Sequence, residues 1–241
     1  IARERIQGQR PDIPEGKRFW PTTADERNEL EALTATGGMR SLVTHLVHRD
    51  DDADIELLDA KYWVKGCSSL GHLRYALLVR LLSKGSADEL CLVDVKEALK
   101  AAAPHATKTE MPRDNAERVK QGAIHLAPNL GERMMTGRIG GRTVFVRELR
   151  PQDLKIDLER LDETEAMDVA HYLGNVVGRA HASQLSWSDR KRWLGELARN
   201  RPKSIDAPSW LWRSVVELVQ AHEGSYLEHC RRYANQIRAT R

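Results

Sequence analysis

The sequence predicts an α+β protein with an antiparallel five-stranded lobe, a helical lobe and a helical amino-terminal arm. Apolar residues recur at helical spacing near both ends of the chain, and short strand-like runs separated by glycine-containing turns fill the middle. Helices and strands that are segregated along a chain are typical of α+β folds. We therefore divide the 241 residues into an arm at 1–53, a strand-rich lobe at 54–150 and a helical lobe at 151–241.

The arm begins with about twenty residues that are interrupted by proline and glycine, which indicates an extended segment ending at Trp20-Pro21. Thr23 and Glu26 have the spacing of a capping box, in which each side chain accepts a hydrogen bond from the backbone of the other residue. A helix should therefore follow Thr23. A second helix is predicted over 39–49, because apolar residues recur there every three or four positions.

The middle of the chain alternates between apolar runs and turns. The predicted strands span 54–66, 73–82, 90–96, 133–139 and 142–149. The last two should form a hairpin across Gly140-Gly141, because glycine accepts the positive φ of a two-residue turn. A helix over 115–127, capped by Asn115, should interrupt the strands.

The remainder is predicted to be helical. A long helix over 162–184 should bury one face, and further helices are expected at 188–200, 208–222 and 224–239. The residues expected on the buried face of the long helix are Ala166, Val169, Ala170, Leu173 and Val177.

Composition excludes several classes of protein. The net charge is only +3, and positive and negative residues are interspersed, so a nucleic-acid partner is not expected. Because no apolar run approaches the roughly 18 residues that span a bilayer, no membrane partner is expected. Three cysteines without a CxxC motif favour a reducing, cytoplasmic location, and the scattered histidines give no metal-binding motif.

Three features of the strand-rich lobe could together bind a nucleotide. Residues 66–71 (GCSSLG) form a small-residue loop between two strands, where backbone N–H groups can approach phosphates. Lys96 ends the third strand, where alternation places its side chain on the same face as Leu92 and Asp94. Glu117 on the following helix could hold that lysine in place. Taken singly, each feature has a plainer interpretation: a hairpin turn, a solvated lysine or a surface carboxylate. Their order is that of a protein-kinase-like amino-terminal lobe.

Several stretches resemble the carboxy-terminal half of an uncharacterised bacterial family grouped with the protein-kinase-like superfamily. These stretches are WVKGCSSLGHLRYALLV, LVDVKEA, NAERVKQGAIHLAPNLGERM, FVRELRPQDLK and VVGRAHASQ, and they cover roughly residues 54–238. The helix ending in VVGRAHA also resembles one in aminoglycoside-phosphotransferase-like enzymes.

The resemblance implies that ATP, accompanied by Mg²⁺, is the cofactor. It implies that the loop covers the phosphates, that Lys96 contacts them, that Glu117 orients Lys96, and that the segment after the last strand meets adenine. The residues so assigned are Gly66, Ser68, Ser69, Gly71, Lys96, Glu117, Glu148 and Leu149.

A phosphotransferase also needs a catalytic loop and metal ligands, and no such motif follows His181. The triplet His48-Arg49-Asp50 spells a kinase motif, but it lacks the later asparagine, so we interpret it as a solvated acidic linker. We assign no catalytic residue and no metal ligand.

Two interpretations of function follow. The chain is either the ATP-binding portion of a kinase-like phosphotransferase or a catalytically silent kinase-like binding or scaffold module. In the first, an upstream half supplies the missing groups, which the start at Ile1 favours, and the phosphate acceptor is a small molecule or a protein. A catalytic-loop motif upstream of Ile1 would distinguish the two.

Overall fold

The computed structural model describes residues 11–45, 49–66, 70–82, 88–102, 110–127, 133–149, 157–199 and 207–239. The chain forms two compact units, Ile1–Ala180 and His181–Arg241. All the described strands lie in the first unit.

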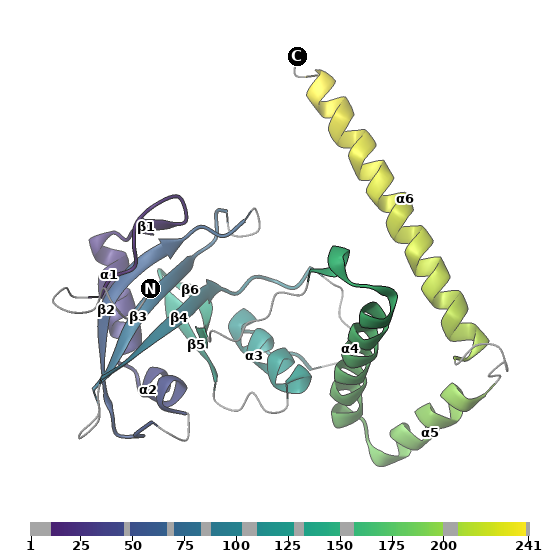
Figure 1. Ribbon diagram of the computed structural model, residues 1–241, viewed down its shortest axis with the longest axis horizontal. Helices are drawn as coiled ribbons and strands as arrows, with labels where there is room; N and C mark the ends of the chain where they lie inside the picture. Colours follow the sequence, from purple (N-terminus) through teal and green to yellow (C-terminus); the bar gives the residue numbers. More distant parts are fainter. Residues whose placement is uncertain are drawn as a thin grey trace. The chain divides into compact units, whose positions relative to one another are not determined.

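The first unit contains an open antiparallel sheet with the strand order β1-β2-β3-β4-β6-β5 (Figure 1). Its strands are β1 (Phe19–Pro21), β2 (Asp54–Trp63), β3 (Arg74–Leu82), β4 (Glu89–Glu97), β5 (Met134–Ile139) and β6 (Arg142–Leu149). The predicted α+β class and antiparallel sheet are confirmed. The predicted count of five strands is wrong, because the described sheet has six.

The additional strand is β1, which belongs to the segment predicted to be an extended arm. Its three residues pair with the outer edge of β2, where Phe19 lies opposite Trp63 and Trp20 lies opposite Tyr62. The paired rings are 5.6 and 6.1 Å apart between centroids, which is within the range of favourable aromatic contacts. Aromatic packing across the strand pair thus stabilises an edge strand too short to be recognised from its sequence.

The β5–β6 hairpin turns at the predicted glycine pair. Gly140 and Gly141 have φ angles of +56° and +73°, which side chains with a Cβ atom rarely adopt. This turn fixes the register in which Ile139 pairs with Arg142.

The helices are α1 (Ala24–Thr34), α2 (Gly37–Thr44), α3 (Asn115–Leu126), α4 (Glu163–Gln184), α5 (Trp187–Ala198) and α6 (Ser209–Ala239), with a 3₁₀ turn at Leu158–Arg160. The predicted capping box is present: Thr23 Oγ1 accepts from the Glu26 N–H at 3.2 Å, and the Glu26 carboxylate accepts from the Thr23 N–H at 2.8 Å.

Three predicted helix boundaries are wrong. Helix α2 ends at Thr44 rather than at 49. Asp114, not Asn115, caps α3, and its carboxylate accepts from the backbone N–H groups of Ala116 and Glu117. Helix α6 is continuous through Gly224, where two helices were expected, because a single glycine weakens a long helix without ending it.

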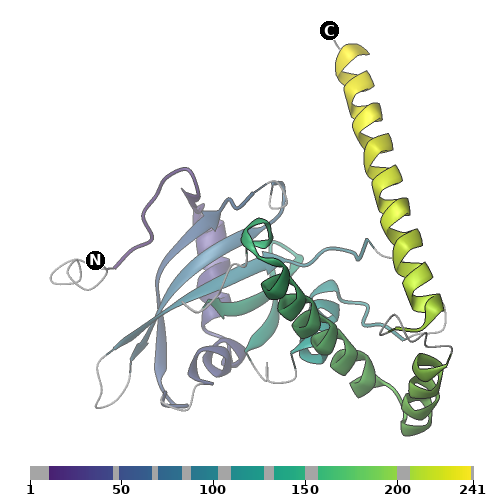
Figure 2. The same ribbon diagram turned by 45° about the vertical axis from the view of Figure 1, so that its right-hand side comes forward.

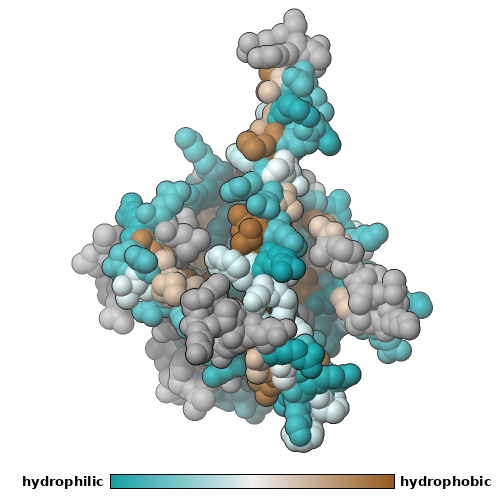
Figure 3. Space-filling model, turned by 90° about the vertical axis from the view of Figure 1, so that its right-hand side faces the viewer, coloured by the Kyte–Doolittle hydropathy of each residue, from teal (hydrophilic) through white to brown (hydrophobic). Residues whose placement is uncertain are grey.

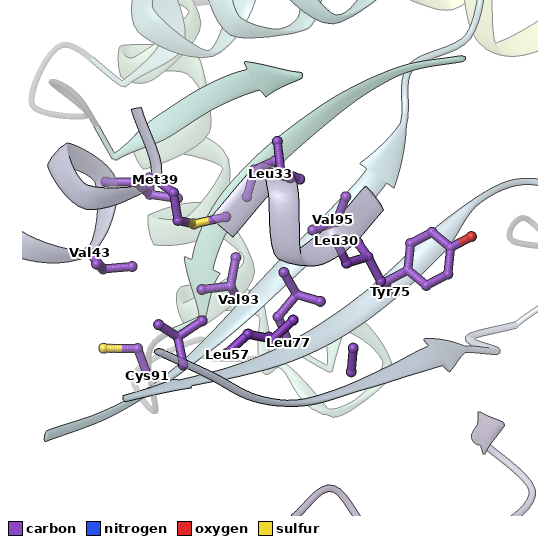
Figure 4. Close-up of a cluster of buried hydrophobic side chains, with 14 of the residues drawn as sticks. Leu30, Leu33, Met39, Val43, Leu57, Tyr75, Leu77, Cys91, Val93 and Val95 are labelled. Carbon is purple, nitrogen blue, oxygen red and sulfur yellow. The ribbon is translucent and has the colours of Figure 1, made fainter. Parts of the chain in front are cut away.

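Helices α1 and α2 cover one face of the sheet and enclose the main core (Figures 1, 2 and 4). Leu30, Met39 and Val43 of these helices are fully buried against Tyr75 and Val95 of the strands. Along β3 and β4 the core residues have odd numbers, as the two-residue period of a strand requires. The even-numbered residues of these strands therefore lie on the opposite face.

Helix α3 lies on that opposite face, over β5 and β6. On the edge strand β5, Met135 and Gly137 face α2 and α1, so that Gly38 and Leu33 lie beside them. Arg138 points the other way and pairs at 3.3 Å with Asp114, the cap of α3. Helix α3 therefore covers the part of the open face that is formed by β5 and β6.

The apolar face of α4 is largely exposed. Leu173 and Val177, predicted to be buried, have 54% and 45% of their surface exposed, and Ala180 is the only buried residue of the helix. Ala166 and Ala170 are also exposed, and Val169 is half-buried. The predicted burial of this face is wrong, because helical periodicity shows which residues share a face but not whether another element covers it.

In the second unit, α6 also carries exposed apolar side chains, and Figure 3 shows brown residues among teal ones along it. No helix in the described ranges combines the length and the hydropathy needed to cross a bilayer.

Candidate functional site

Three rows of side chains cross the sheet on the face opposite α1 and α2. The strand registers place Arg74, Lys96 and Phe145 in the first row, Ala76, Asp94 and Arg147 in the second, and Leu78, Leu92 and Leu149 in the third. The first row lies nearest to the 66–71 loop, because Arg74 begins β3. Over β3, β4 and β6, charged groups thus lie at the loop end of this face, and an apolar row lies beside them. On β2, the register adds Lys61 to the second row and Asp59 to the third.

A charged cluster occupies the first two rows; we call it the Asp94 cluster, made of Arg74, Asp94, Lys96 and Arg147. Arg74 donates two hydrogen bonds to the Asp94 carboxylate, from Nε at 3.2 Å and from Nη2 at 3.0 Å. Lys96 Nζ lies 3.0 Å and Arg147 Nε 3.9 Å from Asp94 Oδ2. The Asp94 side chain has no exposed surface, whereas those of Lys96 and Arg147 are 26% and 40% exposed.

The cluster has an excess of positive charge. Three cationic side chains converge on one carboxylate, so two positive charges lack a partner within the cluster. Burial lowers the pKa of Lys96 below its ordinary value, and the neighbouring charges of Arg74 and Arg147 act in the same direction, while Asp94 opposes them. An anion bound beside Lys96 would relieve this repulsion.

Aromatic rings support two of the cations. The Arg74 guanidinium lies 4.1 Å from the centroid of the Trp63 ring, and Lys96 Nζ lies 5.7 Å from that of Phe145. Cations within about 6 Å of a ring face are attracted by its quadrupole. Trp63, Arg74, Lys96 and Phe145 therefore form a connected layer at the loop end of the sheet.

The ends of the 66–71 loop are built from glycines in the left-handed region. Gly66 and Gly71 have φ angles of +68° and +77°, and a Cβ atom at either position would meet nothing within 4 Å. The requirement for glycine there is therefore conformational. Cys67 and the predicted phosphate-binding residues Ser68 and Ser69 lie outside the described residues.

Glu97 anchors the segment that follows the loop. Its carboxylate accepts from the Leu73 N–H at 2.9 Å and pairs with Arg142 of β6 at 3.1 Å. The Tyr62 hydroxyl donates to the carbonyl of His72 at 2.6 Å. Residues 72–73 are thus held by β2 and β4, and Arg142 of β6 in turn contacts Glu97.

The structure does not pair Lys96 with Glu117. Among the described residues, the carboxylate that contacts Lys96 is that of Asp94, and the Glu117 carboxylate instead accepts from the side chain of Gln121 at 3.2 Å. The sequence had placed Asp94 on the same face as Lys96 without giving it a role.

Glu148 and Leu149 point to opposite faces. The Glu148 carboxylate lies on the α2 side, where both of its oxygens accept from Arg49 at 3.0 Å. Leu149 ends the apolar third row on the open face. Of the two, the Leu149 side chain therefore lies on the same face as Lys96.

Arg49 corrects the interpretation of the His48-Arg49-Asp50 triplet. Its side chain is only 3% exposed, pairing with Glu89 at 2.6 Å as well as with Glu148, whereas Asp50, Asp51 and Asp52 are exposed. The predicted solvated linker is therefore wrong for Arg49, and His48 lies outside the described residues. No sequence pattern marks an arginine whose partners are 40 and 99 residues away.

The described residues do not fit a Mg²⁺ site. Among them, no group of three or more histidine, cysteine or acidic side chains is arranged to hold a metal ion. The Asp94 carboxylate, which is buried on the open face, is already engaged by three cations. We therefore assign no metal ligand to them.

Comparison with known proteins supplies the family. The family described as "Uncharacterized protein conserved in bacteria (DUF2252)" matches residues 2–232. Searches of curated proteins and of solved structures gave no match. Because the match covers more than half of the chain, including the sheet, the Asp94 cluster and most of α6, the chain belongs to this uncharacterised bacterial family.

Proposed function

We propose that this chain binds a nucleotide, with ATP as the expected ligand, on the open face of the sheet. The observation that carries the proposal is the Asp94 cluster, with its excess positive charge, beside the glycine-ended loop. Phosphate groups are recognised by charge-assisted hydrogen bonds from lysine and arginine and by backbone N–H groups of small-residue loops. The lysine and arginine donors lie at the end of the open face from which β3 begins, three residues after Gly71.

The third row supports binding of a base. Leu78, Leu92 and Leu149 are cross-strand neighbours, and each is half-buried. A flat apolar surface next to cations fits a ligand that is planar at one end and anionic at the other. In this arrangement Leu149 contacts the base, and Glu148 contributes through its backbone while its side chain stabilises the opposite face.

The connectivity supports a kinase-like relationship, which we include in the proposal. The 66–71 loop joins two antiparallel strands, Lys96 lies on the next strand, α3 follows, and two further strands complete the sheet. Kinase-like amino-terminal lobes combine a glycine-rich loop, a strand lysine and a helix glutamate around ATP. Lys96 and α3 lie on the same face here, as such a site requires.

The test is a thermal-melt titration of the 241-residue chain with ATP and with ADP, each with and without Mg²⁺. A ligand at 100 times its Kd adds about 2.7 kcal/mol to the free energy of unfolding, which raises the melting temperature. The rise should be lost in Lys96→Ala and kept in Lys100→Ala, which alters an exposed lysine four residues later. No rise in the parent, or an equal rise in both variants, would reject the proposal.

The pairing of Lys96 with Asp94 favours a second candidate, a silent binding or scaffold module. A phosphotransferase of this design would use a Lys96–Glu117 pair. Release or transfer of the ATP γ-phosphate, lost in Glu117→Gln, would support the phosphotransferase. Binding that is unchanged in Glu117→Gln, without turnover, would support the module.

A further inference from the structure

Arg147 is a member of the Asp94 cluster to which the sequence assigns no role. It lies on β6 directly opposite Asp94, and its Nε is buried without a hydrogen-bond partner among the described residues. The distance from Nε to Asp94 Oδ2, 3.9 Å, is too long for a hydrogen bond. A buried donor without an acceptor is unfavourable, and among the described residues the Nε of Arg49 is in the same state.

The three cations of the cluster differ in how many of their donor nitrogens are engaged by other protein atoms. Arg74 is 11% exposed, holds Asp94 with two nitrogens and lies against Trp63, so it is largely committed to the protein. Lys96 uses one contact with Asp94 and retains exposed surface. Arg147 is the most exposed of the three cations, and its Nε has no hydrogen-bond partner among the described residues.

Asp94 holds the two available cations close together. Lys96 Nζ and Arg147 Nε both lie within 4 Å of the same oxygen, Asp94 Oδ2, although they come from neighbouring strands. Without that carboxylate the two cations would repel each other. A phosphate group can accept from both at once, because it carries several acceptor oxygens and arginine presents its donors as a planar fork.

We propose that Arg147 is a ligand-binding residue that contacts the same phosphate group as Lys96, with Asp94 positioning both. The inference rests on the proposed nucleotide binding and adds to it the second cation and the acceptor that they share. The contact would come from the exposed part of the Arg147 side chain, because Nε itself is buried.

The experiment compares ATP affinity by isothermal titration calorimetry in the parent, Arg147→Gln and Arg147→Lys. Arg80→Gln is the matched control, since Arg80 lies on the same face of β3 and pairs with Glu56 and Asp88 away from the cluster. We expect Arg147→Gln to weaken binding roughly 10- to 100-fold, as for loss of charge-assisted hydrogen bonds. Arg147→Lys should be intermediate, and Arg80→Gln should bind like the parent.

Two further measurements separate ligand contact from a structural role. The ligand-free melting temperature of Arg147→Gln should equal or exceed that of the parent, because the substitution removes an unpaired buried donor. In a Lys96→Met/Arg147→Gln double variant, the loss of affinity should be smaller than the product of the single losses if both residues share one phosphate.

The outcomes are distinguishable. If the parent does not bind ATP, the proposed function fails. If the parent binds and Lys96→Ala does not, but Arg147→Gln binds like the parent, only the role of Arg147 is overturned. A lowered ligand-free melting temperature in both Arg147 variants, with unchanged affinity, would make Arg147 structural and would also overturn it.

Discussion

Arg49 and Glu148 meet through two parallel hydrogen bonds of 3.0 Å, although 99 residues separate them in the sequence. The Arg49 guanidinium also donates to the carbonyl of Val43 at 2.5 Å and to Glu89 at 2.6 Å. Although burial acts to lower it, the hydrogen bonds to Glu89 and Glu148 raise the pKa of Arg49 above its ordinary value. This one side chain joins the end of α2 to the first residue of β4 and to the end of β6.

Replacing Arg49 by alanine should lower the free energy of unfolding by about 3–5 kcal/mol, because it leaves the buried Glu148 carboxylate without its partner. Arg40→Ala is the control: Arg40 pairs with the exposed Asp54 at 3.8 Å, and its loss should cost less than about 1 kcal/mol. Urea unfolding of both variants measures the difference. Equal effects would show that the Arg49 pair contributes no more than a surface pair.

Substitution of Gly71 should test the left-handed conformation at the end of the loop. Gly71→Ala should destabilise the fold by about 1–2 kcal/mol, because an L-residue is strained at a φ of +77°. Gly122→Ala, on the exposed side of α3, should stabilise it by up to about 1 kcal/mol. Thermal unfolding gives both signs, and a stabilising Gly71→Ala would contradict the assigned backbone geometry.

The affinity for a phosphate anion should begin to fall at a lower pH than the pH at which an ordinary lysine loses its proton. The pKa of Lys96 lies below its ordinary value of 10.5, so the ammonium loses its proton at a lower pH than in the unfolded chain. Titrations with ATP between about pH 7 and 10 should show the fall in the parent and not in Lys96→Arg, since arginine stays protonated. A parallel fall in both would exclude Lys96 as its source.

The same shift has a consequence for stability. Between the folded and unfolded pKa values of Lys96 the unfolded chain binds more protons, so this group makes the fold more stable as pH rises through that interval. The parent should show this rise relative to Lys96→Met in urea unfolding at a series of pH values. A fall in the parent relative to Lys96→Met would contradict the assigned direction.

The two described cysteines should differ sharply in reactivity. Burial raises the pKa of Cys91 to about 12, despite the opposing charge of Arg49, whereas Cys230 is exposed on α6. In a Cys67→Ser background at neutral pH, iodoacetamide should therefore label Cys230 and spare Cys91, because the thiolate is the reactive form. Peptide mapping measures the labelling, and unfolding in urea should expose both. Equal labelling in the native state would contradict the burial of Cys91.

Local patterns in the sequence predicted local structure well. The capping box at Thr23 and Glu26 and the turn at Gly140-Gly141 depend only on neighbouring residues, and both are present. Strand alternation also placed Leu92, Asp94 and Lys96 on one face, which the structure confirms.

What the sequence could not supply was the register between strands. Arg74 and Arg147 join Asp94 only because β3 and β6 flank β4 in one particular alignment, which no pattern within a single strand determines. Arg49 was missed for the same reason, since its partners are distant in sequence. The burial of Leu173 and Val177 was overestimated because amphipathic spacing does not supply a covering element.

Glu97 connects the glycine-ended loop to the strand that carries Lys96. It follows Lys96 directly on β4, and its carboxylate holds the backbone of Leu73 at the foot of the glycine-ended loop. A displacement of Leu73 would therefore displace Glu97 and the strand that carries Lys96. The contact between Glu97 and Arg142 would extend this displacement to the β5–β6 hairpin. The Glu97 carboxylate thus couples the backbone position at the end of the loop to that of the strand carrying Lys96.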